Sequence, residues 1–251
     1  MAFAQLAPID RLAPRRRPRG VPVLHQRWHA LAFLHWPFSA AALRRVVPAG
    51  LEVDVHGGDA WVGVTPFRVS RLRPTLLPPL PFVSSAEEIN VRVYVHRDGV
   101  PGIWFPSLEI TNRLALLGAR IGYRLPYFHA RMRVERDGDV VAFTSVRTGG
   151  LAASFDACWR VGARLPEAEP GSLEFFLTER YVLYSGDDRH MLRTRIHHRP
   201  WPLRTATVVR LATTLLEADR LPTPTTPALG HAQAEPLDVE IWAPARCVGA
   251  P

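Results

Sequence analysis

One predicted strand carries four polar side chains of different chemistry on a single face. The run EEINVRVYV, residues 87–95, alternates polar and β-branched residues. Because successive side chains of a strand point to opposite faces, an acid, an amide, a guanidinium and a phenol follow one another about 7 Å apart. They are Glu88, Asn90, Arg92 and Tyr94. Two interpretations stay open, because a solvated sheet face is also polar: a wet surface or a ligand site.

A second strand, residues 102–110, follows a tight-turn signal at residues 98–99, and this arrangement predicts a hairpin. Strict alternation places Ser107 and Glu109 together on one face. Pro106 cannot donate a hydrogen bond to a neighbouring strand, so it predicts an edge, a bulge or a bend. Such a feature commonly turns a side chain toward a cavity.

A helical pattern then covers residues 112–123. Arg120 lies on this predicted helix, and Tyr127 follows it. Two roles for Arg120 stay open. Its guanidinium either holds an anionic ligand with two parallel hydrogen bonds or pairs with Glu109 or Glu88.

These residues together define a candidate site, on the condition that the sheet closes and one face looks inward. Each unpaired charge inside would cost several kcal/mol, so Glu88 and Arg92 must be paired, hydrated or in contact with a ligand. A pocket with a fixed arginine suits a small carboxylate or carbonyl compound. We predict Glu88 and Ser107 as catalytic candidates. The predicted ligand-binding residues are Asn90, Arg92, Tyr94, Glu109, Arg120 and Tyr127.

The rest of the chain predicts many strands and a few short helices, which indicates an α+β fold dominated by antiparallel sheet. Further strands are expected over residues 28–36, 51–55, 60–73, 127–135, 140–147, 153–163, 180–184, 190–198 and 237–242. Further helices are expected over residues 40–47, 172–178 and 207–220.

The basic charge is concentrated at one end of the chain. Half of the formal net charge of +8 lies in the first 22 residues, where five arginines and four prolines stand against one aspartate. We predict residues 1–22 to be a disordered basic arm and residues 23–251 to be a single domain. The remaining charge is ordinary, and the chain contains no nucleic-acid-binding motif, so we predict no nucleic-acid partner.

Several other classes lose support from the sequence. No uncharged run reaches the ~20 residues of a membrane-spanning helix, and no signal peptide is present. The two cysteines, Cys158 and Cys247, are far apart. The adjacent His197 and His198 point to opposite faces of a strand, so we predict no metal site and no cofactor. Motifs of serine hydrolases, nucleotide-binding loops and zinc proteases are absent. A cytoplasmic location is expected.

Across residues 20–243 the sequence resembles the YqjF-like family of conserved bacterial proteins of unknown function. The resemblance rests on the pattern E-x-N-x-R-x-Y-V, P-G-I-x-F-x-S-L-E, A-R and L-P-Y around the predicted hairpin, and on FLHW, AWVGVTPF, FLTERY, H-x-P-W-P-L and LDVEIW elsewhere. Because this family is similar in fold to acetoacetate decarboxylase, the resemblance implies a closed or nearly closed β-structure with an interior pocket. It implies no particular activity.

One run allows a comparison of residues. WFPSL, residues 104–108, looks like the G-F-P-K-K run of the decarboxylases, and the resemblance places Ser107 where those enzymes carry their Schiff-base lysine. Glu88 matches an active-site acid of the superfamily in the same way. The chain contains no lysine, and arginine cannot act as an amine nucleophile. A Schiff-base decarboxylase is therefore excluded.

Three hypotheses remain for function. The first is a binding protein for a small carboxylate or carbonyl compound. The second is a lysine-independent lyase or hydrolase that uses Glu88 as acid–base group and Arg92 or Arg120 as anion clamp. The third is a structural or interaction protein in which the polar cluster is an internal salt-bridge network.

Overall fold

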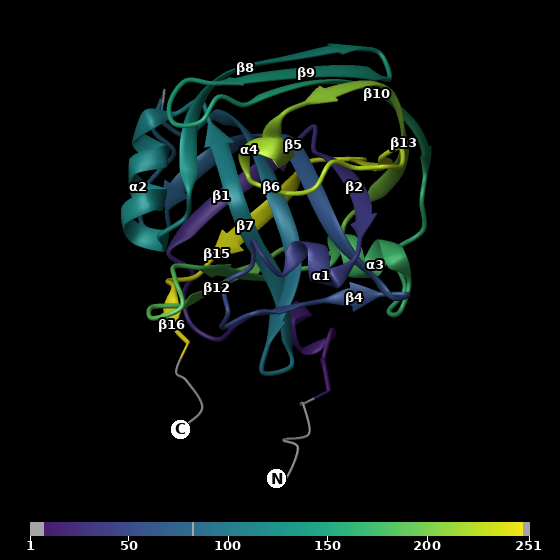
Figure 1. The fold of residues 1–251 in the computed structure, drawn as a ribbon. Coiled ribbons are helices and arrows are strands. Elements are labelled where there is room, and N and C mark those ends of the chain that lie inside the picture. The colour runs from purple at the N-terminus through teal and green to yellow at the C-terminus, as the bar shows by residue number, and fades with distance from the viewer. Residues whose placement is uncertain (1–7, 82, 248–251) are drawn as a thin grey trace.

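The strands form one continuous sheet that closes on itself (Figure 1). The computed structural model describes residues 8–81 and 83–247, and sixteen strands lie within these residues. Most neighbouring strands are antiparallel, and β7 makes parallel pairs with both β8 and β11. The predicted fold class, mainly antiparallel and closed with a few short helices, is confirmed.

The hydrogen-bonded pairs trace two rings that share a wall. One ring runs from β1 through β15, β12, β11, β7, β6 and β5 back to β1. Its strands are β1 (Leu24–His29), β5 (Asp59–Pro74), β6 (Ala86–Arg97), β7 (Val100–Ile110), β11 (Val182–Ser185), β12 (Leu192–His197) and β15 (Leu237–Ile241). We call it the seven-strand ring.

The second ring uses β5, β6 and β7 again and closes through β8, β9, β10, β13, β14 and β2. We call it the nine-strand ring. Its further strands are β2 (Ala32–Phe38), β8 (Tyr127–Asp137), β9 (Val140–Arg147), β10 (Ser154–Arg164), β13 (Leu203–Thr213) and β14 (Leu229–Gln233). The short strands β3 (Glu52–Val53), β4 (Val55–His56) and β16 (Ala245–Arg246) add to the edges.

Four short α-helices and one 3-10 turn accompany the strands within the described residues. Two helices begin at side-chain caps: the Asn112 side chain accepts hydrogen bonds from the amides of α2, and the Ser172 side chain accepts one from α3. The helical elements are η1 (Ala13–Arg15), α1 (Ala40–Leu43), α2 (Arg113–Tyr123), α3 (Leu173–Thr178) and α4 (Leu215–Ala218).

The alternation of β6 assigns its two faces to the two rings. Its β-branched face packs into the largest core, together with residues of β2, β9, β10, β13 and β14. Its polar face turns into the seven-strand ring, where Glu88, Asn90, Arg92 and Tyr94 are all buried. The polar face is therefore interior rather than solvated.

The predicted helix over residues 207–220 is wrong. Residues 203–213 form β13, which pairs with β10 on one side and β14 on the other, and the helix α4 covers only Leu215–Ala218. β10 pairs with this segment as far as Thr213, whereas β14 pairs only with residues 203–205. The ladder with β10 satisfies backbone groups of the segment, and its threonine and valine residues suit a strand. The predicted strand 28–36 is also divided, since Ala30 has a φ of 48° between β1 and β2.

The N-terminal segment was predicted to be a disordered basic arm over residues 1–22, of which residues 1–7 lie outside the described part. Residues 8–22 contact the strands. Arg11 donates two hydrogen bonds to Asp54, at 2.6 and 2.7 Å, and Arg17 donates two to Glu240, at 2.6 and 2.9 Å. Arg11 and Arg17 of this segment therefore have defined carboxylate partners in the rest of the protein.

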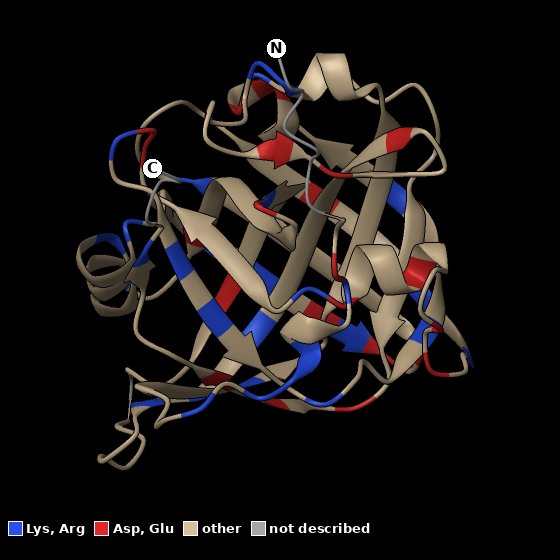
Figure 2. Ribbon diagram, turned by 90° about the horizontal axis from the view of Figure 1, so that it is seen from below, with Lys and Arg blue, Asp and Glu red and all other residues tan. Residues whose placement is uncertain are grey.

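Charges of both signs are spread over the strands. Figure 2 shows basic and acidic positions interspersed on the ribbon, without a side covered by one sign in this view. None of the described helices is long and apolar enough to cross a membrane.

The closure between β7 and β11 yields a stability prediction. The two strands share only two paired positions, and a Cβ on Gly102 would lie 2.7 Å from the Tyr184 ring and 2.8 Å from the Val182 carbonyl oxygen. We expect Gly102→Ala to lower the free energy of unfolding by about 1–3 kcal/mol in chemical denaturation. The control Gly122→Ala, on α2 with open space around it, should leave stability equal or higher. Equal stability of both variants would contradict the tight closure.

Candidate ligand-binding cavity

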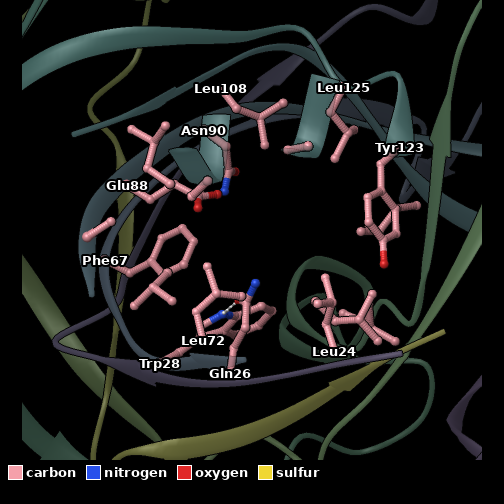
Figure 3. A pocket seen from close by; sticks show the side chains of 18 of the residues that line it. Leu24, Gln26, Trp28, Phe67, Leu72, Glu88, Asn90, Leu108, Tyr123 and Leu125 are labelled. Atoms are coloured by element: carbon pink, nitrogen blue, oxygen red, sulfur yellow. Dashed lines mark hydrogen bonds between the residues drawn. The ribbon is translucent and has the colours of Figure 1, made fainter. Parts of the chain in front are cut away.

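A cavity of about 440 Å³ lies inside the seven-strand ring. Every strand of the ring contributes to its lining, and α2 contributes to its rim together with Pro78, Leu80, Val83 and Ser84. Figure 3 shows side chains of several of these elements surrounding an open centre. Most of the lining is aliphatic or aromatic, and a few polar groups converge on it, which is the usual constitution of a small-molecule site.

Arg92 supplies a buried positive charge to this cavity. Its Nε donates a hydrogen bond of 2.9 Å to Asn90 Oδ1, and its guanidinium lies 5.5 Å from the Phe33 ring and 6.0 Å from the Phe105 ring. Within the described residues, no carboxylate forms an ion pair with Arg92. The side chain is 9% exposed, so the protein buries this charge with an amide and two aromatic faces as its neighbours.

Glu88 lies on the same strand face but does not neutralise Arg92. Its Oε1 accepts a hydrogen bond of 2.9 Å from the Tyr127 hydroxyl. Burial raises the pKa of Glu88 to about 8, against the opposing influence of the Tyr127 hydrogen bond and the Arg92 charge. Glu88 is therefore mainly protonated at pH 7. Because Oε1 accepts, Oε2 is the oxygen that carries the proton.

Three residues that line the cavity each carry one buried polar atom without a hydrogen-bond partner among the described residues. The atoms are Arg180 Nη2, His198 Nε2 and Trp201 Nε1, and their residues are each about 4% exposed. The His198 Nδ1 lies 2.7 Å from the Arg199 carbonyl oxygen, which only accepts, so Nδ1 carries the proton. Burial lowers the pKa of His198 to about 4, so its Nε2 is a free acceptor at neutral pH.

Arg180 differs from Arg92 because its charge is compensated. Its Nη1 donates a hydrogen bond of 2.8 Å to Asp54 Oδ2, and its Nε donates one of 2.7 Å to the Phe176 carbonyl oxygen. Asp54 also accepts from Arg11. The guanidinium of Arg180 lies 4.3 Å from the Phe176 ring. Arg92 thus remains the buried cation of the cavity without an ionic partner.

A β-bulge in β7 separates two polar clusters that the sequence predicts as one. The register between β6 and β7 shifts by one residue opposite Arg92, where Phe105 and Pro106 stand. Before the bulge Phe105 faces the cavity, and after it Leu108 does. Ser107 and Glu109 consequently point to the other side of the strand.

On that other side, Ser107 and Glu109 belong to a compact buried network. Arg147 donates 2.8 Å and 3.2 Å hydrogen bonds to Glu109 Oε1 and Ser107 Oγ. Ser107 Oγ donates to Asp219 Oδ2 at 2.5 Å, and Ser145 Oγ donates to Glu109 Oε2 at 2.6 Å. Burial raises the pKa of Asp219 to about 6. These side chains form an internal salt-bridge network at a position apart from the cavity.

Tyr94 and Arg120 also contact groups other than the cavity. The Tyr94 hydroxyl donates to the Leu177 carbonyl oxygen at 2.7 Å and lies 2.7 Å from His35 Nε2, below the cavity at α3. Arg120 Nε donates to the Tyr127 carbonyl oxygen at 2.7 Å, which fixes the end of α2 to β8. Of the eight predicted site residues, the structure gathers four on the cavity: Glu88, Asn90, Arg92 and Tyr127.

Arg180, His198 and Trp201 were not predicted as site residues. The signal was available, because Arg180 lies in FLTERY and the other two lie in H-x-P-W-P-L, both runs that carry the family resemblance. Nothing in their spacing connects them to β6, from which they are at least 80 residues distant. Among the described residues, no group of three or more metal-ligating side chains forms a metal site.

The ring architecture and its interior cavity place the protein in the acetoacetate decarboxylase-like fold. An acetoacetate decarboxylase-like enzyme from Sphingomonas wittichii RW1 matches 90% of this chain and 93% of its own, with a TM-score of 0.63 and 13% identity. The enduracididine biosynthesis enzyme MppR, complexed with pyruvate, matches 90% and 91%, with a TM-score of 0.63 and 12% identity. At these identities the likeness shows the fold alone.

The chain belongs to the DUF2071 family of uncharacterized conserved proteins, whose model matches residues 25–235. The uncharacterized protein YqjF of Bacillus subtilis (strain 168) is 38% identical over 225 residues, which are 90% of this chain and 93% of that protein. The resemblance drawn from the sequence motifs is confirmed.

The raised pKa of Glu88 predicts a pH-dependent stability. Its folded-state pKa of about 8 exceeds the usual value of 4.5, so the folded protein binds more protons than the unfolded chain between these limits. Its contribution is complete below about pH 4.5 and is lost as pH rises toward 8, by up to about 1.4 kcal/mol per pH unit.

The test is the difference in unfolding free energy between wild type and Glu88→Gln from pH 5 to 8 in urea. We expect the unfolding free energy of the variant to increase relative to that of wild type as pH rises, because glutamine cannot ionise. Other titrating groups are the same in both proteins and cancel in the difference. Parallel curves would contradict a buried proton on Glu88.

The network around Arg147 predicts a large loss of stability. Arg147 and Glu109 are 2% and 1% exposed, so Arg147→Met leaves a buried carboxylate without its cation. We expect a loss of about 3–5 kcal/mol in chemical denaturation. The matched control Arg160→Met breaks the pair with Asp139, whose members are 58% and 53% exposed, and should cost about 0–1 kcal/mol. Similar small losses would show that the network has no structural role.

Proposed function

We propose that the protein binds a small organic carboxylate or carbonyl compound in the cavity of the seven-strand ring, without Schiff-base chemistry. The observation that carries the proposal is Arg92, a buried guanidinium that lines the cavity and has no carboxylate partner among the described residues. A carboxylate ligand would supply the missing countercharge with two parallel hydrogen bonds.

The neighbouring groups support the same ligand chemistry. A protonated Glu88 can donate from Oε2 to a carbonyl or carboxylate oxygen, and Asn90 adds an amide on the same face of β6. An ionised Glu88 would instead repel an anion. The pyruvate complex of MppR, a protein of similar fold, is a further support for a carboxylate with an adjacent carbonyl.

The absence of lysine limits the chemistry of this proposal. No side chain of the sequence can form a Schiff base with a bound carbonyl compound. Ser107, which the family resemblance places at the lysine's position, donates to Asp219 on the far side of β7. Binding therefore rests on charge and hydrogen bonds.

One observation favours a second candidate, a lysine-independent lyase or hydrolase. Glu88 lines the cavity with a pKa of about 8, which is near neutral pH and suits a general acid or base. In this candidate Glu88 transfers the proton and Arg92 holds the anionic part of the substrate. Turnover of a bound compound by wild type, lost in Glu88→Gln with binding retained, would distinguish it from simple binding.

A thermal-shift screen tests the proposal with pyruvate, other small carboxylates, ketones and aldehydes. A ligand at about 100 times its dissociation constant stabilises the folded protein by about 2.7 kcal/mol, which is roughly 5–10 °C for a chain of this size. We expect Arg92→Gln to lose the shift caused by carboxylates. The control Arg160→Gln, on an exposed arginine of β10, should keep it.

Two results would contradict the proposal. One is a screen in which no carboxylate or carbonyl compound shifts wild type. The other is a carboxylate shift that is equal in wild type and Arg92→Gln, since binding would then not involve the cavity arginine.

A further inference from the structure

The cavity has a charged buried end and an apolar exposed end. Arg92, Arg180, His198 and Trp201 are each at most 9% exposed. At the rim, Leu80 is 52% exposed and Leu114 is 64% exposed. A ligand that fills the cavity therefore contacts hydrogen-bonding groups at the inner end and hydrocarbon between that end and the rim.

The charges at the inner end add up to a single uncompensated cation. Arg180 is paired with Asp54 at 2.8 Å. Glu88 is protonated and His198 is neutral at pH 7, because burial raises the pKa of the first and lowers that of the second. Arg92 alone stays unpaired, so this end accommodates one negative charge rather than two and repels a cation.

The path from the inner end to the rim is lined mainly by aliphatic and aromatic side chains, with Gln26 and the half-buried Arg73 among them. In Figure 3, Leu24, Leu72, Leu108, Tyr123 and Leu125 surround the opening. An apolar lining stabilises a complex when an apolar part of the ligand covers it, by an amount that grows with the area covered. The volume of about 440 Å³ lies in the range of sites for drug-sized molecules. A ligand as small and polar as pyruvate would leave most of this lining uncovered.

We infer that the ligand is a monocarboxylate with an extended apolar tail, whose carboxylate lies against Arg92 and whose tail runs toward the rim at Leu114. The inference rests on the proposed function and adds the class and the orientation of the ligand. It excludes very short acids as the preferred ligands.

Isothermal titration calorimetry with straight-chain monocarboxylates from acetate to decanoate, below their micelle concentrations, tests the inference. We expect affinity to rise about fourfold for each added methylene, the factor that corresponds to burial of one such group. The primary alcohol of equal length should bind at least ~10-fold more weakly, since it lacks the charge that Arg92 meets.

Two leucines of α2 provide a matched pair of variants. Leu114 lines the cavity, whereas Leu117 does not, and both are exposed. We expect Leu114→Gln to weaken binding of long acids and to leave short acids unchanged, and Leu117→Gln to change neither. Arg92→Gln should weaken every acid by the same factor. If that variant does not fold, the chain-length series and the two leucine variants still test the inference.

The outcomes separate the inference from the proposed function. If short acids bind as tightly as long monocarboxylates, the inference fails and the proposed function stands. If long acids bind equally to wild type, Leu114→Gln and Arg92→Gln, they attach to exposed apolar surface and the inference fails. If no carboxylate of any length binds, the inference fails, and the proposed function fails with it when the carbonyl compounds of the thermal-shift screen do not bind either.

Discussion

A guanidinium in a protein interior must be solvated by the protein or by a ligand, because desolvation of an ion costs several kcal/mol. Arg92 meets this constraint through an amide, two aromatic rings and a cavity rather than through a carboxylate. The nearest acid on its strand face, Glu88, is protonated instead of ionised. The ring of strands around them keeps bulk water away from both groups. The unusual charge state of Glu88 and Arg92 therefore depends on closure of the sheet.

The shared wall explains how one protein holds two polar clusters with different roles. β6 keeps strict alternation and so presents its polar face to the seven-strand ring alone. β7 does not, because Phe105 and Pro106 together stand opposite Arg92. That one extra residue sends Glu109 into the network with Arg147, where each charged group has a partner, and leaves Arg92 facing the cavity. We expect the cluster with complete internal pairing to contribute to stability, and the cluster without it is the ligand site that we propose.

Sequence patterns located most elements, because alternation and turn residues act locally. The helix predicted over residues 112–123 is α2, and the polar face of β6 was read correctly from its period of two. The failures have non-local causes. Residues 207–213 form a strand because β10, which is about 50 residues earlier in the sequence, pairs with them. Pro106 predicts a bulge, but the direction in which the bulge turns Ser107 depends on the register with β6, which no local pattern contains.

The same limit applies to the inner end of the cavity. Arg180 and His198 reach it from segments that are distant in sequence from β6, and their proximity to Arg92 follows only from ring closure. Fold likeness could not supply their roles either, since a likeness at 12–13% identity shows the architecture alone. The chain contains no lysine, so its cavity offers no lysine amine for a Schiff base. What the cavity recognises must therefore follow from its own charge, one unpaired arginine beside a protonated acid, and from the hydrocarbon that surrounds them.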